Sequence, residues 1–216
     1  MPTIMTILYP RTASSTFDLD YYLSKHMPLA AKYWYPRGMQ RYHVETHAEG
    51  PYTVKAECVW DSLDAFKAAK EVEEEIKEIF GDVKNYSNEA PVQWFGEVVG
   101  TGEKSDPTAA MPSGIITVLY PRTATATFNL NYYLSTHLRL ATKYWYPRGM
   151  KRYHVETYAE GPYAVKAELL WDSLDAWKAA TEVEVEMKEL VEDIKKYSSE
   201  DPVRLYGEVV GTGEKP

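Results

Sequence analysis

The stretch LYPRTASSTFDLDYYLSKHMPLAAKYWYPRGMQRYHVET, residues 8–46, decides the fold, because it returns as LYPRTATATFNLNYYLSTHLRLATKYWYPRGMKRYHVET at residues 119–157. The correspondence covers nearly the whole chain, since Ile4–Lys104 aligns with Ile115–Lys215 without a gap. Self-similarity at a fixed period marks repeated structural units. Two near-equal units on one chain usually bury surface against each other, so we predict a pseudo-dimer within the chain.

The repeat also sets the predicted domain boundaries. We expect one unit at 1–102, a linker rich in Gly, Ser, Pro and Ala at 103–113, and a second unit at 114–216. The linker contains a Met-Pro pair that matches the start of the chain, as if two reading frames had been joined. An engineered fusion and a recent natural duplication both explain these features, and the sequence leaves both open.

Composition and charge limit the classes of protein to which the chain can belong. The 216 residues carry a net charge of −8 with no block of Lys and Arg, so we expect no nucleic-acid partner. No apolar run approaches the ~18 residues of a membrane span, and the N-terminus lacks a basic export signal. Cys58 is the single cysteine, which excludes an intrachain disulfide. We predict a cytoplasmic protein with no membrane partner.

Hydrophobic periodicity and turn residues predict strand, helix, strand, strand, helix, strand in each repeat. In the first repeat the expected elements are Ile4–Tyr9, Leu19–Tyr33, Gln40–His47, Tyr52–Trp60, a helix from Ser62 to Val83, and Pro91–Val99. This βαββαβ order is the ferredoxin-like split motif, an α+β fold. Pro28 should kink the first helix, and Arg139 at the matching place predicts a straighter helix in the second repeat.

Strand alternation gives each sheet one apolar face and one charged face. The charged face of the first repeat carries Arg41, His43, Glu45, His47, Lys55 and Glu57, and that of the second carries Arg152, His154, Glu156, Tyr158, Lys166 and Glu168. On an isolated sheet such residues would form a solvated outer surface. If the two sheets face each other, these groups line an enclosed space, where charges must pair or shift their pKa values.

Three motifs then point to a known family: DYYLSKHMPL at 20–29, GDVKNYSNEAPV at 81–92 and GEVVG at 96–100. Together they resemble the EthD-like proteins of the dimeric α+β barrel superfamily. The resemblance implies ferredoxin-like units that pair sheet to sheet into a barrel. Relatives include cofactor-free isomerases, cyclases and monooxygenases acting on small organic molecules. It also implies that His26 lies near an active cleft, whereas His137, followed by Leu138-Arg139, departs from the motif.

The first functional hypothesis is cofactor-independent acid–base catalysis on a small, partly apolar organic molecule in the barrel interior. A carboxylate or imidazole with a shifted pKa can act as a general base, and a neighbouring cation can stabilise an oxyanion. The catalytic candidates are His43, Glu45, His47, Lys55, Glu57, His154, Glu156, Tyr158, Lys166 and Glu168. The candidates for substrate binding are His26, Arg41, Arg152, His137 and Trp94.

Two alternatives remain open. The charged residues could form an internal ion-pair network in a non-catalytic scaffold or binding barrel. The four glutamates of the two charged faces could instead bind a hard cation, although the interleaved Lys and Arg argue against a metal site. We predict no cofactor, because the chain has no glycine-rich phosphate loop and no signature haem ligand.

Overall fold

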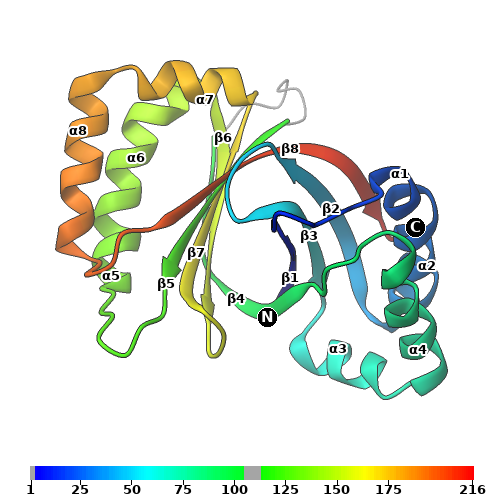
Figure 1. Cartoon of the computed structure of the whole chain (residues 1–216). Coiled ribbons are helices and arrows are strands. Elements are labelled where there is room, and N and C mark those ends of the chain that lie inside the picture. The colour runs from blue at the N-terminus through cyan, green and yellow to red at the C-terminus, as the bar shows by residue number, and fades with distance from the viewer. Residues whose placement is uncertain (1–2, 105–112) are drawn as a thin grey trace. The chain divides into compact units, whose positions relative to one another are not determined.

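The computed structural model describes residues 3–104 and 113–216 (Figure 1). The predicted linker at 103–113 therefore lies largely outside the described residues. The described elements of the first repeat are β1 (Thr3–Pro10), α1 (Leu19–Tyr21), η1 (Tyr22–His26), α2 (Met27–Trp34), η2 (Tyr35–Arg37), β2 (Met39–His47), β3 (Tyr52–Trp60), α3 (Leu63–Lys70), α4 (Glu73–Gly81), η3 (Val83–Asn85) and β4 (Val92–Glu103). They follow the predicted order, with each predicted helix divided into shorter segments.

The second repeat contains the same elements in the same order. They are β5 (Gly114–Pro121), α5 (Leu130–Tyr132), η4 (Tyr133–His137), α6 (Leu138–Trp145), η5 (Tyr146–Arg148), β6 (Met150–Tyr158), β7 (Tyr163–Trp171), α7 (Leu174–Thr181), α8 (Glu184–Asp193), η6 (Ile194–Lys196) and β8 (Val203–Glu214). Hydrogen-bonded neighbours follow the closed order β1-β3-β2-β8-β5-β7-β6-β4. The predicted α+β barrel of two βαββαβ halves is confirmed.

The chain forms two compact units, Met1–Glu97 with Val209–Pro216, and Val98–Glu208. Strands β4 and β8 each contribute one part to each unit. Both strands continue beyond the predicted strand end at Val99 and its counterpart. The last residues of β4 lie beside β6, where the Lys104 amide donates to the Lys151 carbonyl at 2.7 Å. Strand β4 thus includes Glu103, the first residue of the predicted linker. The predicted division at 1–102 and 114–216 stays a prediction.

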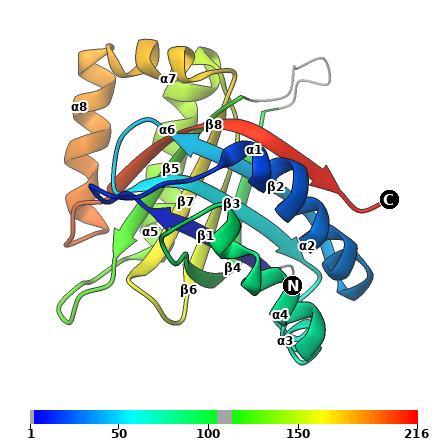
Figure 2. The ribbon, with the colours of Figure 1, turned by 45° about the vertical axis from the view of Figure 1, so that its right-hand side comes forward.

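Within each unit, all helices cover the same face of the sheet (Figures 1 and 2). In the first unit this face carries Val44, Ala56, Cys58 and Trp60, each 0% exposed. These side chains belong to a core cluster with residues of α2 and α3, and Trp60 lies 5.2 Å from Phe66 between ring centroids. Burial of apolar surface against the helices therefore fixes which face of the sheet carries the charged residues.

The first helix of each repeat contains a π-helical segment, η1 or η4. The amide of Met27 donates to the carbonyl of Tyr22, and in the second repeat Leu138 donates to Tyr133 in the same way. The straighter helix expected in the second repeat is not observed, because the segment forms with Arg139 as it does with Pro28. The proline is therefore not its cause. Such segments often mark functional positions, and each ends on a buried histidine.

The turn into β2 needs a glycine at Gly38, whose φ is 113°. A Cβ there would lie 3.0 Å from the Cβ of Ala65. We expect Gly38→Ala to lower the free energy of unfolding by about 1–2 kcal/mol, the cost of left-handed backbone for an L-residue. Gly81 is the control, since nothing lies within 4 Å of its added Cβ. In urea unfolding, Gly81→Ala should raise the free energy of unfolding by about 0.5 kcal/mol. Equal losses of unfolding free energy in the two variants would contradict the requirement for glycine at Gly38.

In the parts of the chain that the structure describes, no helix combines the length and apolar character needed to cross a membrane.

Candidate functional site

Charged side chains of β2 and β3 form a buried cluster in the first unit. Glu45 lies opposite Lys55 in the strand register, and His43 lies opposite Glu57. The Lys55 ammonium is 2.7 Å from Glu45 Oε1 and 3.3 Å from Glu57 Oε1. His43 Nε2 is 2.9 Å from the same Glu45 oxygen, and His47 Nε2 lies 3.8 Å from the other. Opposite charges therefore face each other directly across the strands.

The cluster is closed to water. Glu45 and Lys55 are 0% exposed and Glu57 is 1% exposed. An isolated buried charge costs many kcal/mol, so charges persist here because each acid contacts a cation. Arg41, at the start of the same face, is exposed, because the register shifts between Met39 and Arg41.

The second unit repeats the cluster with one change. Lys166 lies 2.7 Å from Glu156 Oε1, and His154 Nε2 lies 2.9 Å from the same atom. His154 is also 3.0 Å from Glu168. The Tyr158 hydroxyl, which replaces His47, donates to Glu156 Oε2 at 2.9 Å. Arg152 is exposed, as Arg41 is, at the start of its strand face.

Electrostatics keep His154 and Glu156 of this second cluster charged. Burial alone would lower the pKa of His154, but the carboxylates of Glu168 and Glu156 outweigh burial and raise it to about 9. Burial opposes the charge on Glu156 too, yet Lys166 and His154 hold its pKa below the ordinary value. At neutral pH His154 is therefore a cation and a poor general base. The cluster behaves as a compensated ion network.

The raised pKa of His154 predicts a pH-dependent stability. Because the pKa is about 9 in the folded chain and about 6.5 when unfolded, the stabilisation is complete below about pH 6.5 and disappears as the pH rises through about 9. The His154 side chain is 19% exposed, so we expect a loss of roughly 2–3 kcal/mol over this window. Urea unfolding at several pH values should show this loss of unfolding free energy for the unmodified chain. A His154→Gln variant that loses the same free energy over this pH window would contradict the prediction.

A second polar group lies on the helix side of the sheet and is built from residues far apart in the sequence. In the second unit, His137 Nδ1 is 2.9 Å from Asp193 Oδ2. The Tyr197 hydroxyl is 3.2 Å from His137 Nε2, and the Tyr120 hydroxyl is 2.8 Å from that of Tyr197. We call the chain Asp193–His137–Tyr197–Tyr120 the relay. Tyr132 also donates to Asp193, at 2.8 Å, which fixes the carboxylate.

The first unit contains the same arrangement. His26 Nδ1 lies 2.9 Å from Asp82, and its Nε2 lies 3.2 Å from the Tyr86 hydroxyl. Tyr86 in turn lies 2.8 Å from Tyr9. Each histidine is the last residue of its π-helical segment, and Tyr22 stacks on His26 with ring centroids 5.1 Å apart. This constellation is therefore a property of the repeat.

The relay has a definite direction for protons. Burial lowers the pKa of His137, although Asp193 opposes the effect, so the imidazole is neutral at pH 7. A carboxylate only accepts hydrogen bonds, so Nδ1–H donates to Asp193 and Nε2 accepts from Tyr197. Burial also raises the pKa of Tyr197 and of Tyr120, which keeps both phenols protonated. The relay can therefore pass a proton from Tyr120 through Tyr197 to His137.

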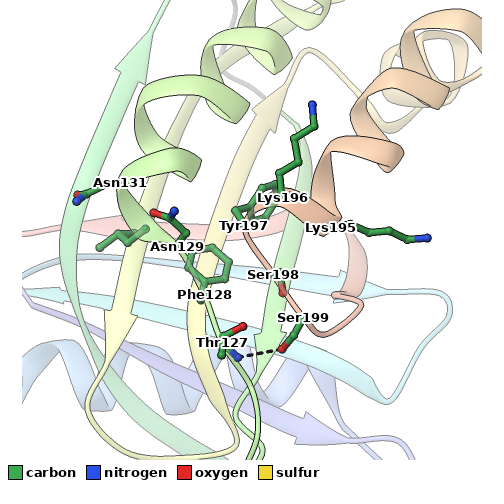
Figure 3. Close-up of a pocket in the computed structure, with 10 residues that line it drawn as sticks. Thr127, Phe128, Asn129, Asn131, Lys195, Lys196, Tyr197, Ser198 and Ser199 are labelled. Atoms are coloured by element: carbon green, nitrogen blue, oxygen red, sulfur yellow. Dashed lines mark hydrogen bonds between the residues drawn. The ribbon is translucent and has the colours of Figure 1, made fainter.

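A cavity of about 50 Å³ opens beside the relay in the second unit. Its polar lining includes His137, Tyr120, Tyr197 and Arg204, and its apolar lining includes Trp145 and Trp177. A wider surface pocket of about 560 Å³ lies next to it (Figure 3). Tyr197 lines both. One residue of the relay therefore belongs to the lining of both the cavity and the surface pocket.

The structure places the predicted residues in two groups. The catalytic candidates of the first unit gather in the cluster on β2 and β3, and those of the second unit gather in the matching cluster. Trp94 is buried on β4, opposite Thr6 and on the same face as Glu57. His26 and His137 lie apart from these clusters, on the helix side of the sheet.

Sequence reasoning missed the partners of the two histidines: Asp82, Tyr86, Tyr9 and their counterparts. One signal was present. GDVKNYS at 81–87 returns as EDIKKYS at 192–198, and both the acid and the tyrosine survive while neighbouring residues change. The separation of 56 residues between His26 and Asp82 gave no sign that they meet.

Comparison with known proteins shows which solved structures share this architecture. No family model matches the sequence, and no curated protein matches it. The crystal structure of an anthrone oxidase-like protein aligns over 99% of this chain and 93% of its own, with 14% identity and a TM-score of 0.61. An EthD-like protein from Ralstonia eutropha JMP134 is 31% identical over 49% of this chain and 96% of its own, with a TM-score of 0.43. The chain belongs to the dimeric α+β barrel superfamily, with EthD-like repeats.

Other solved structures share the fold at low identity. A heme-binding protein from Thermus thermophilus covers 97% of this chain, with 91% of its own length aligned, 10% identity and a TM-score of 0.54. At such identities the likeness concerns the fold alone. Function within the superfamily has to be argued from the side chains of this chain.

Proposed function

We propose that the chain catalyses proton transfer on a small, partly apolar organic molecule, with the relay of the second unit as its acid–base group. One observation supports this above all: a neutral histidine, oriented by Asp193, connects through two hydroxyls to the wall of a cavity. A general base works best when its pKa lies near the operating pH and its orientation is fixed. His137 is neutral at pH 7 and is held by Asp193, whereas His154 is charged.

The proposed reaction removes a proton from a carbon next to a carbonyl group. The Tyr120 oxygen takes the substrate proton as its own proton moves to Tyr197, and the Tyr197 proton moves to His137 Nε2. The broken C–H bond leaves its electron pair in an enolate. Asp193 stabilises the imidazolium that forms, 2.9 Å from the ring. Return of the protons to another carbon of the substrate completes an isomerisation.

The buried clusters on β2, β3, β6 and β7 fit a structural role better. This is the second proposed reading, a binding scaffold whose internal ion pairs set the strand register. It rests on the raised pKa of His154, which reflects an acid and a base that neutralise each other. A metal would compete with Lys166 for the Glu156 oxygen that the ammonium contacts at 2.7 Å.

The test is deuterium uptake from D₂O by small carbonyl compounds, followed by NMR with butanone and pyruvate as probes. The natural chain should accelerate exchange of the protons next to the carbonyl group. Tyr197→Phe removes the hydroxyl that connects the relay and should abolish the acceleration. If the chain accelerates exchange with neither probe, or if Tyr197→Phe exchanges at the natural rate, the proposal is wrong.

A further inference from the structure

Arg204 is a cation on the wall of the cavity of the second unit. It lies on β8 opposite Val118 of β5, so its side chain belongs to the helix side of the sheet. The residue is half-buried and lines the cavity together with His137, Tyr120 and Tyr197. Across residues 3–104 and 113–216, its side chain forms no hydrogen bond or ion pair. A guanidinium with all its donors available matches the two oxygens of a carboxylate.

The charge of Arg204 acts on the relay. Burial raises the pKa of both Tyr197 and Tyr120, and Arg204 is among the groups that oppose this rise. Burial lowers the pKa of His137, and the positive charge of Arg204 lowers it further. An anion bound at Arg204 would therefore lie within electrostatic reach of the groups that exchange protons.

The repeat supplies an internal comparison, because the first unit has Gln93 where the second has Arg204. The surface pocket that Tyr197 lines differs in the same direction. It carries Lys195, Lys196, Asn129 and Asn131, where the matching pocket of the first unit carries Lys84, Asn85, Asp18 and Asp20 (Figure 3). Lys195 matches Lys84, so three pocket positions change charge, and together with Arg204 for Gln93 all four changes make this region of the second unit more positive, on a chain whose net charge is −8. Positive potential at a pocket raises the local concentration of anions.

The size of the cavity limits the ligand. One water needs roughly 10–15 Å³, so about 50 Å³ holds a group of about three to five non-hydrogen atoms, which is most of a molecule of the size of pyruvate. Trp145 and Trp177 on the opposite wall favour an apolar tail. Val191, which is 49% exposed, belongs to the lining and replaces the larger Phe80 of the first repeat.

We propose that the second unit binds a short oxo-carboxylate, with its carboxylate on Arg204 and its enolisable carbon at the Tyr120 end of the relay. This inference rests on the proposed function and names the substrate class for the same cavity. The proton on that carbon passes to the Tyr120 oxygen, and the C–H electron pair becomes the enolate. The carboxylate takes no part in the bond changes and holds the molecule in place.

Binding of pyruvate tests the inference without turnover. Ligand-observed NMR at neutral pH should show pyruvate bound to the natural chain and its neutral amide, pyruvamide, bound at least tenfold more weakly. Arg204→Gln introduces the residue of the other repeat and should weaken pyruvate binding at least tenfold. Lys178→Gln removes one exposed charge from α7 and should leave binding unchanged.

The outcomes separate the two proposals. His137→Gln should still bind pyruvate, because Arg204 and not the relay holds the carboxylate. Equal binding of pyruvate and pyruvamide, natural affinity in Arg204→Gln, or no pyruvate binding by the natural chain would each overturn the carboxylate site. If butanone exchange is nevertheless lost in Tyr197→Phe, the proposed function stands without it. If pyruvate binds through Arg204 and no probe exchanges, the site stands and the catalytic proposal fails.

Discussion

Replacing Lys166 with methionine is expected to lower the free energy of unfolding by about 3–5 kcal/mol, because the buried acids Glu156 and Glu168 would then share a single cation, His154. Lys166 and Glu156 are both 0% exposed, and their charged atoms are 2.7 Å apart. Methionine fills similar volume, so the loss reports charge and not a cavity. Chemical denaturation measures it.

The double variant Lys166→Met with Glu156→Gln distinguishes charge from packing. It removes both members of the pair, so much of the lost stability should return, because no uncompensated carboxylate is left. Lys178→Met is the matched control, since the Lys178 side chain is 71% exposed and its change should cost less than about 0.5 kcal/mol. If Lys166→Met and Lys178→Met lose the same stability, the ion network contributes nothing.

Replacing His137 with glutamine is expected to slow carbonyl-directed proton exchange by about 10²–10⁴-fold, the usual contribution of a positioned acid–base group. Asp193→Asn should also slow exchange, because the amide no longer fixes the Nδ1–H tautomer or stabilises the imidazolium. The pKa of His137 lies below its ordinary value. The rate of the natural chain should therefore rise with pH through a midpoint below about 6.5 and then level off.

The first unit supplies the control for the relay. His26→Gln removes the same hydrogen bonds, to Asp82 and Tyr86, from the unit that lacks Arg204. With pyruvate as probe we expect His26→Gln to retain most of the exchange rate and His137→Gln to lose it. Circular dichroism and unfolding curves should match for the two variants. A larger effect of His26→Gln would place the chemistry in the other unit.

The charged face of the sheet could be predicted because its rule is local. Side chains alternate along a strand, so apolar Val44, Ala56 and Trp60 fix the opposite direction for Glu45 and Lys55. The sign of the ion pairs also follows from the register, which a short turn sets. Whether His154 is charged could not be predicted, because its pKa depends on the balance between burial and two carboxylates.

The relay could not be predicted for a different reason. Its members come from β5, the first helix and the end of the second helix, and no local pattern links them. Pro28 gave a misleading signal, since the π-helical segment that directs the histidine forms in both repeats. The contact between histidine and aspartate occurs together with the π-helical segment in both repeats, whereas this proline is present only in the first.

By itself, the sequence determined a duplicated βαββαβ fold, an apolar and a charged face for each sheet, and the family of the repeats. Periodicity and repetition carry this information, because burial of apolar surface acts on neighbouring residues along a strand or helix. Only the tertiary structure decided which polar groups meet, which of them keep their charge, and that Arg204 shares a cavity with the relay. Distances between distant segments and the water removed from around them set those properties, and neither is written in local sequence.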